Sequence, residues 1–232
     1  MGRATILVLV CCLFAGAAEP LPVWREPARP QRYLEAAGRR SALFGNGTGI
    51  FEAWLFPVKV LHDFRLLFQV EGSLERAEAD GMASQIEVTP AATAITYSHA
   101  AFTLRQTLWA PRERPALVVE LEVETSRPLT VFVQFRNDLR PMWPAAIGGQ
   151  YNAWLPAGQA TEGEADDPGM LLAEPTRRLA AFMGSAAFDA SSDEGDHMLP
   201  DRPTVLRLKP FPAGPGRAAI IMAGGERFQT QH

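Results

Sequence analysis

A strict alternation of apolar and polar residues is the feature that most constrains what this chain can fold into. From Leu117 to Glu124 the odd positions are all aliphatic, whereas positions 120, 122 and 124 are glutamate. After a break at 126–128 the pattern resumes from Leu129 to Arg136. Successive side chains of a β-strand point to opposite faces, so both segments predict strands with one buried and one solvated face. The short connection between them predicts a β-hairpin.

Shorter segments of the same kind, separated by breaks rich in proline, continue along the chain. No longer stretch carries a convincing helical stripe, and breaks recur roughly every ten residues, as in sandwich folds. We therefore predict an all-β fold, an antiparallel β-sandwich with little helix. Further strands are expected at 50–58, 64–71, 84–89, 93–99, 102–109, 170–174, 178–183, 205–209 and 218–223. Residues 61–63 are expected to connect the first two of these, and 34–40 to form at most a turn of helix.

The amino terminus has the pattern of a secretory signal peptide. Arg3 precedes an apolar run from Ile6 to Phe14, and small residues follow as far as Ala18. The run is about half of the roughly 20 residues that a helix needs to cross a bilayer, so we expect cleavage rather than a membrane anchor. The expected product is exported to the periplasm or the extracellular medium. The expected organisation is a signal peptide (1–18), an extended lead-in (19–31) and one β-sandwich domain (32–232).

Composition excludes several classes of function. Both cysteines, Cys11 and Cys12, lie in the signal peptide, which leaves the mature chain without disulfides, thiolate nucleophiles or cysteine metal ligands. The net charge is −4 and positive charge is not clustered, so we expect no nucleic-acid partner. The four histidines lack metal-ligand spacing. The acidic stretch that begins at Asp189 has Glu194 and Pro200 where a calcium loop needs glycine and glutamate, so neither a metal nor a cofactor is expected.

Residues 136–155 contain the most distinctive side chains of the sequence. Flat aromatic rings flanked by planar polar groups can hold a sugar by stacking and hydrogen bonding. Large aromatic side chains are usually highly buried, so a place in the sandwich core or at an interface with another domain is the more expected role of the same residues. The candidate carbohydrate-binding residues are Trp143, Tyr151, Trp154, Arg140 and Asn152.

Short segments spread over most of the mature chain also form an informative combination. They are Arg32-Tyr33-Leu34, Phe51-Glu52-Ala53-Trp54, Pro57-Val58-Lys59, the run from Ile95 to Gln106, and Met142-Trp143-Pro144 followed by Gly148-Gly149-Gln150-Tyr151. Together they resemble the opening of bacterial six-hairpin glycosidase-like proteins of the glycogen-debranching, or amylo-α-1,6-glucosidase, type. The resemblance implies an amino-terminal β-supersandwich, similar to that of galactose mutarotase, followed by an (α/α)6 barrel that carries the catalytic acids. No helical hairpin of such a barrel is present in this sequence, so no catalytic residue is assigned.

The acids of the sequence do not form a pair that can be placed across a sugar, as glycoside hydrolysis requires. Glu52 and Asp63 lie in apolar surroundings and are the acids most expected to be buried. A salt bridge to one of the nearby arginines is the expected role of each, since buried carboxylates usually have partners. The arginines considered are Arg39, Arg40 and Arg65.

Three functions therefore remain open. The first is a non-catalytic amino-terminal sandwich of an exported carbohydrate-active protein, which would pack against a downstream (α/α)6 barrel and should expose an apolar face when alone. The second is a free-standing carbohydrate-binding module. The third is a mutarotase-like enzyme, which would need an acid and a base in one pocket and for which His99 is the only histidine in an expected strand.

Overall fold

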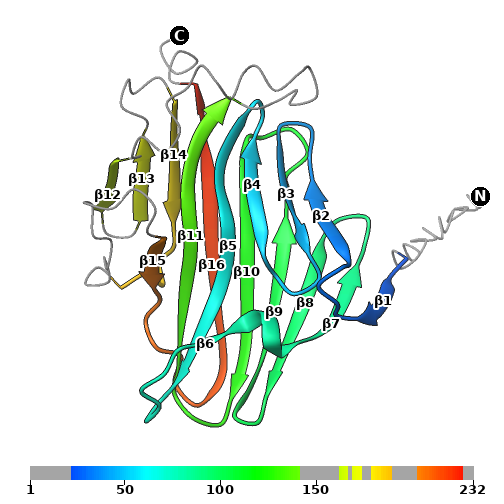
Figure 1. The fold of residues 1–232 in the computed structure, drawn as a ribbon, viewed down its shortest axis with the longest axis vertical. Coiled ribbons are helices and arrows are strands. Elements are labelled where there is room, and N and C mark those ends of the chain that lie inside the picture. The colour runs from blue at the N-terminus through cyan, green and yellow to red at the C-terminus, as the bar shows by residue number, and fades with distance from the viewer. Residues whose placement is uncertain (1–21, 142–161, 167–168, 174–178, 190–202, 227–232) are drawn as a thin grey trace, which may run out of the picture.

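The chain forms a sandwich of two antiparallel β-sheets, as the alternating pattern predicts (Figure 1). The computed structural model describes residues 22–141, 162–166, 169–173, 179–189 and 203–226. Within these ranges the only helical element is a single 3-10 turn, Ala79–Met82. The described part of the chain holds no helix that is both long and apolar enough to cross a membrane.

One sheet has nine strands and the other has seven. The nine-stranded sheet has the order β1 (Trp24–Pro27), β7 (Ala83–Val88), β8 (Thr93–His99), β9 (Phe102–Trp109), β10 (Ala116–Thr125), β16 (Gly214–Glu226), β14 (Leu179–Gly184), β13 (Gly169–Ala173) and β12 (Glu162–Asp166). The seven-stranded sheet has the order β15 (Thr204–Arg207), β11 (Leu129–Pro141), β5 (Val58–Val70), β4 (Phe51–Leu55), β3 (Ser41–Asn46) and β2 (Tyr33–Ala37), and β6 (Ala77–Glu78) pairs with β5.

The core lies between the two sheets and follows from the alternation. In β10, Leu117, Val119 and Leu121 are fully buried, while Glu120, Glu122 and Glu124 lie on the outer face. β11 contributes Val133 and Phe135 to the same core from the opposite sheet. The apolar half of each strand therefore supplies the burial that stabilises the sandwich, because buried aliphatic and aromatic side chains contribute roughly 1.5–3 kcal/mol each.

The predicted hairpin between β10 and β11 is wrong. β10 pairs with β9 and β16, whereas β11 pairs with β5 and β15, so the two strands belong to different sheets. The chain crosses the sandwich at 126–128, where the amide of Ser126 donates to the carbonyl of Ala101 at 2.8 Å. Alternation determines which side chains face the core, and the apolar side chains of both strands do face it. It does not determine the lateral partner of a strand.

Two further expectations are corrected by the strand boundaries. Residues 34–40 contain no helical turn, because Tyr33–Ala37 is strand β2, with alternating exposed and buried side chains. Residues 61–63 are not a connector, because β5 continues through them from Val58 to Val70. The chain instead turns at 56–57, between β4 and β5.

A polar pair is enclosed in the apolar core. The hydroxyl of Tyr97 donates to Oε1 of Gln106 at 2.7 Å, and both side chains are fully buried. Gly49 closes over them in the turn between β3 and β4, with a φ of +93°. A Cβ at this glycine would lie 1.9 Å from the Tyr97 hydroxyl oxygen, so only glycine fits both the backbone conformation and the space.

Candidate functional site

Two neighbouring strands of the seven-stranded sheet, β5 and β11, are irregular at the same level. The register between β5 and β11 shifts between Gln134 and Arg136 and again between Asn137 and Arg140. Asp63 in β5 and Leu139 in β11 both have positive φ angles, of 53° and 46°. Non-glycine residues in this conformation cost of order 1–3 kcal/mol each, and such strain concentrates at functional sites. Bulges of this kind re-aim side chains.

The irregularities bring together four polar side chains, His62, Asp63, Arg136 and Asp138, which we call the bulge cluster. His62 Nδ1 lies 3.5 Å from Asp138 Oδ2, and His62 Nε2 lies 4.0 Å from Asp63 Oδ2. Arg136 Nε lies 3.5 Å from the same Asp63 oxygen. The side chains of His62, Asp63 and Arg136 are 34%, 46% and 39% exposed, whereas that of Asp138 is only 2% exposed. Three members can therefore meet a ligand, and the fourth lies behind them.

The separations in the bulge cluster are those of loose ion pairs. His62 Nδ1 is buried and makes no hydrogen bond, although the Asp138 carboxylate is close enough to attract a protonated imidazole. Optimal hydrogen bonds to carboxylates are shorter, about 2.7–2.9 Å. The cluster therefore combines donors and acceptors at one accessible place without aligning His62 against its neighbouring carboxylate.

Glu52 and Lys59 form a tighter arrangement on the adjoining strands. Lys59 Nζ lies 2.5 Å from Glu52 Oε2, and Trp54 Nε1 donates to Glu52 Oε1 at 2.9 Å. The ammonium of Lys59 also lies 5.8 Å from the centre of the Trp54 ring. These contacts stabilise the carboxylate of Glu52 in place, so we assign Glu52 a structural role.

The predicted environment of Glu52 and Asp63 is wrong in two respects. Neither carboxyl group is buried, since 33% and 46% of their side chains are exposed. Their partners are Lys59 and Arg136, and not the arginines proposed from the sequence. The prediction chose arginines that are close in the sequence, whereas the ion-pair partners in this sheet lie on neighbouring strands. Of the arginines proposed, Arg39 pairs with Glu113 and Arg65 with Glu78.

The predicted carbohydrate-binding residues fall mostly outside the described ranges. Trp143, Tyr151, Trp154 and Asn152 lie there, and their grouping stays a prediction. Arg140 is in β11, where its backbone pairs with that of Lys59 in β5. Within the described ranges, no group of three histidine, cysteine or acidic residues is placed to hold a metal ion.

His99 does not have the surroundings of a catalytic base. It lies exposed at the end of β8, its Nδ1 accepts the backbone N–H of Ala101 at 3.1 Å, and its ring stacks on Phe102 at 5.0 Å. Of the two histidines in the described ranges, His62 is the one with acidic neighbours, and sequence reasoning placed it in a connector. One signal could have found it: two consecutive polar residues between Leu61 and Phe64 interrupt the alternation without a glycine or a proline.

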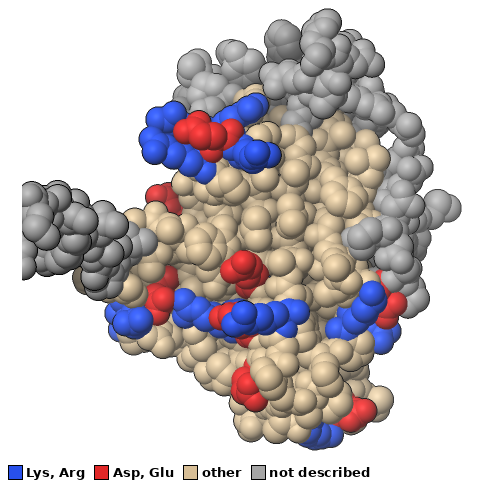
Figure 2. All heavy atoms as spheres, turned by 180° about the vertical axis from the view of Figure 1, so that it is seen from behind, with Lys and Arg blue, Asp and Glu red and all other residues tan. Residues whose placement is uncertain are grey.

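The outer face of the nine-stranded sheet is divided into a charged and an uncharged part. Arg25, Glu87 and Arg105 form a chain of ion pairs at 2.8 and 2.7 Å, and Glu122 pairs with Arg217 at 2.9 Å on strands farther along. The Cα atoms of Arg105 and Glu122 are partners across β9 and β10, so charges of alternating sign cross the sheet. Figure 2 shows this row, with a broad, largely uncharged area on one side of it.

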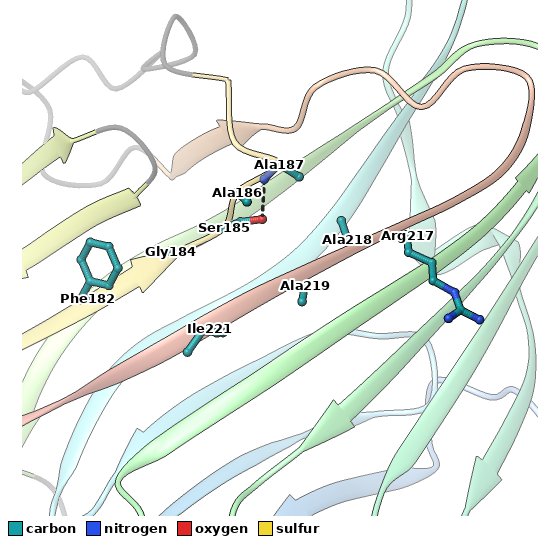
Figure 3. Close-up of a pocket in the computed structure, with 9 residues that line it drawn as sticks. All are labelled: Phe182, Gly184, Ser185, Ala186, Ala187, Arg217, Ala218, Ala219 and Ile221. Carbon is teal, nitrogen blue, oxygen red and sulfur yellow. Dashed lines mark hydrogen bonds between the residues drawn. The ribbon is translucent and has the colours of Figure 1, made fainter.

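Three large apolar side chains are exposed on the outer face of β13, β14 and β16. They are Leu171, Phe182 and Ile221, which are 40%, 42% and 49% exposed, and we call them the apolar patch. An open groove of about 640 Å³ adjoins Phe182 and Ile221, with small residues along it and Arg217 at one side (Figure 3). The Phe182 ring lies close against Gly184 and Gly169, where any Cβ would meet it at 2.3–2.4 Å. An exposed apolar area of this kind usually marks an interaction surface.

Comparison with solved structures finds similarity in fold to a bacterial enzyme of known structure. The chain matches a bacterial glucoamylase complexed with acarbose, with a TM-score of 0.51 and 8% identity over 90% of this chain and 34% of the glucoamylase. This chain thus spans about a third of the length of that enzyme. At this identity the similarity concerns the fold alone.

Two other solved structures match with lower scores. The periplasmic domain of Thermotoga maritima YidC has a TM-score of 0.39 and 12% identity, over 87% of both chains. A polysaccharide lyase has a TM-score of 0.39 and 9% identity, over 85% of this chain and 32% of the lyase. No protein-family model matches the chain, and no curated protein matches it either.

Proposed function

We propose that this β-sandwich is the non-catalytic amino-terminal domain of an exported carbohydrate-active protein of the glycogen-debranching type. Its apolar patch packs against a helical catalytic domain of the same polypeptide and holds that domain in position. The acids that cleave the glycosidic bond belong to the helical domain.

The apolar patch is the observation that carries this proposal. A free-standing domain gains nothing from leaving Leu171, Phe182 and Ile221 side by side in water, because burying such side chains is favourable by roughly 25 cal/mol per Å². The length of the glucoamylase that shares the fold supports a second domain as the occupant, since this chain matches only 34% of it. The charged row beside the patch would form a polar rim, as at many protein interfaces.

The proposal is tested on the chain alone, from residue 19 to residue 232, without the predicted signal peptide. We expect it to bind a hydrophobic dye and to associate with itself as its concentration rises, because the patch lacks its partner. Phe182→Glu and Ile221→Glu should abolish both effects. Leu74→Glu is the matched control, since Leu74 is 99% exposed in the turn between β5 and β6 and lies outside the patch. A monomer that binds no dye, or an equal effect of Leu74→Glu, would contradict the proposal.

A free-standing carbohydrate-binding module is the second candidate, and the accessible bulge cluster favours it. In that case the sandwich would bind a glucan without a catalytic domain. Retarded migration of the chain in a gel that contains glycogen, lost in Trp143→Ala, is the expected result for the predicted aromatic site. Unchanged migration in the glycogen gel would count against this candidate.

A further inference from the structure

We propose that four arginines at one end of the sandwich form a binding surface for an anionic polysaccharide. Arg39 and Arg40 lie in the connection between β2 and β3, and Arg112 and Arg114 lie in the connection between β9 and β10. We call these four residues the arginine cluster. The choice of a polysaccharide rests on the proposed carbohydrate-active function, whereas the preference for oxyanions follows from the guanidinium groups themselves.

Backbone contacts hold the two connections against each other. The amide of Arg39 donates to the carbonyl of Arg112 at 2.9 Å. A Cβ at Gly38 would lie 2.3 Å from the carbonyl oxygen of Pro111, so only glycine allows the two connections to approach this closely. The arginines form two short pairs in the sequence, and the fold brings these pairs together before any ligand binds. Such preorganisation lowers the cost of binding.

One carboxylate is shared by two of the four guanidinium groups. Glu113 Oε1 lies 3.2 Å from Arg39 Nη1 and 3.4 Å from Arg112 Nε. The shared carboxylate keeps these two guanidinium groups close together, although their side chains are 62% and 75% exposed. Because a guanidinium has five N–H donors, Arg39 and Arg112 keep donors for a further oxyanion.

The other two arginines, Arg40 and Arg114, increase the excess of positive charge. Both are exposed, and neither forms an ion pair with any residue that the structure describes. Figure 2 shows blue side chains gathered around red at this end of the molecule. The excess is local, since the whole chain has a net charge of −4. Charges farther away than about 10 Å are largely screened at ordinary ionic strength, so a bound anion would sense the arginine cluster rather than the net charge.

The exposure of the arginine cluster favours a polymer over a small anion. Exposed ion pairs are individually weak and are screened by salt, so a single carboxylate or sulfate would be held poorly. A polymer of uronate or sulfated sugars carries oxyanions at regular intervals and can contact both connections at once, and linked contacts reinforce one another. Planar guanidinium groups also bind carboxylate and sulfate through paired hydrogen bonds.

The test is surface plasmon resonance of the chain without its predicted signal peptide on immobilised polygalacturonate, heparin and neutral dextran. We expect saturable binding to at least one of the two anionic polysaccharides, weaker binding as the salt concentration rises, and no binding to dextran. Arg40→Gln combined with Arg114→Gln should weaken the binding about ten-fold, because two of the four cationic contacts are lost. Arg25→Gln combined with Arg217→Gln removes the same charge from the charged row, and this matched control should bind as the unmodified chain does.

Three results would overturn the inference. The first is an absence of binding by the unmodified chain to both anionic polysaccharides, a measurement that needs no variant to fold. The second is an equal loss of affinity in the matched control, which would indicate attraction to positive charge in general. The third is tighter binding to double-stranded DNA or to phosphatidylglycerol vesicles, which would assign the arginine cluster to another kind of partner.

Failure of this inference is distinguishable from failure of the proposed function. Dye binding and self-association report on the apolar patch, which lies on β13, β14 and β16. Polysaccharide binding reports on the connections of β2 to β3 and of β9 to β10. A chain that binds the dye but neither anionic polysaccharide would therefore refute only the role of the arginine cluster.

Discussion

Replacing Gly49 with alanine tests how the buried polar pair is fitted into the core. Gly49 has a φ of +93°, and its new Cβ would lie 1.9 Å from the Tyr97 hydroxyl oxygen. Backbone strain at a positive φ contributes about 1–3 kcal/mol. Displacing Tyr97 also separates it from Gln106 inside the core, which leaves buried polar groups unsatisfied at about 1–3 kcal/mol. We expect Gly49→Ala to lower the free energy of unfolding by roughly 2–6 kcal/mol, the sum of the two.

The assay is chemical denaturation, with Gly214→Ala as the matched control. Gly214 has a φ of +105°, but a Cβ there would meet no atom within 4 Å. Its substitution should therefore show the backbone strain alone. In a Tyr97→Phe background the hydroxyl oxygen is gone, so Gly49→Ala should cost less than in the unmodified chain. Equal losses for Gly49→Ala and Gly214→Ala, with no dependence on Tyr97, would refute the reasoning.

Three further effects can each be measured separately. Partial burial and a neighbouring carboxylate raise the pKa of Tyr33 to about 12. The free energy of unfolding should therefore fall as the pH rises from 10 towards 12, because Tyr33 ionises first in the unfolded chain. Ultraviolet titration of the phenol checks the raised pKa. The hydrogen bond from Arg105 is the largest cause that lowers the pKa of Glu87, so Arg105→Gln should raise this pKa in an NMR titration. Less than about 1 kcal/mol of stability should be lost, because the pair is partly exposed to solvent. Leu121→Ala should cost about 2–5 kcal/mol in urea unfolding, and Glu122→Ala less than about 0.5 kcal/mol, because only Leu121 is fully buried.

The fold class could be predicted because the alternation in β10 and β11 is strict. A period of two assigns Leu117, Val119 and Leu121 to one face, and that face is the core. Pairing could not be predicted in the same way. Whether the chain after Thr125 turns back beside β10 or crosses to the other sheet depends on contacts with Ala101, which is far away in the sequence.

The bulge cluster shows why a site can be missed when its residues are visible. Arg136 and Asp138 belong to the segment that sequence reasoning considered distinctive, but His62 and Asp63 appear in sequence as a break between two strands. The cluster forms only because β5 and β11 pair across a long separation and both bulge at the same level. Long-range register of this kind leaves little trace in local composition.

The central claim is that the sandwich is one part of a larger protein. Its most direct test is the intact mass of the native product, captured from the source cells with an antibody against this chain. We expect a species much larger than the 25.4 kDa of the 232 residues, which would contain the helical catalytic domain. A species at 25.4 kDa, or slightly below it after signal-peptide removal, would contradict the claim and leave the sandwich to act alone.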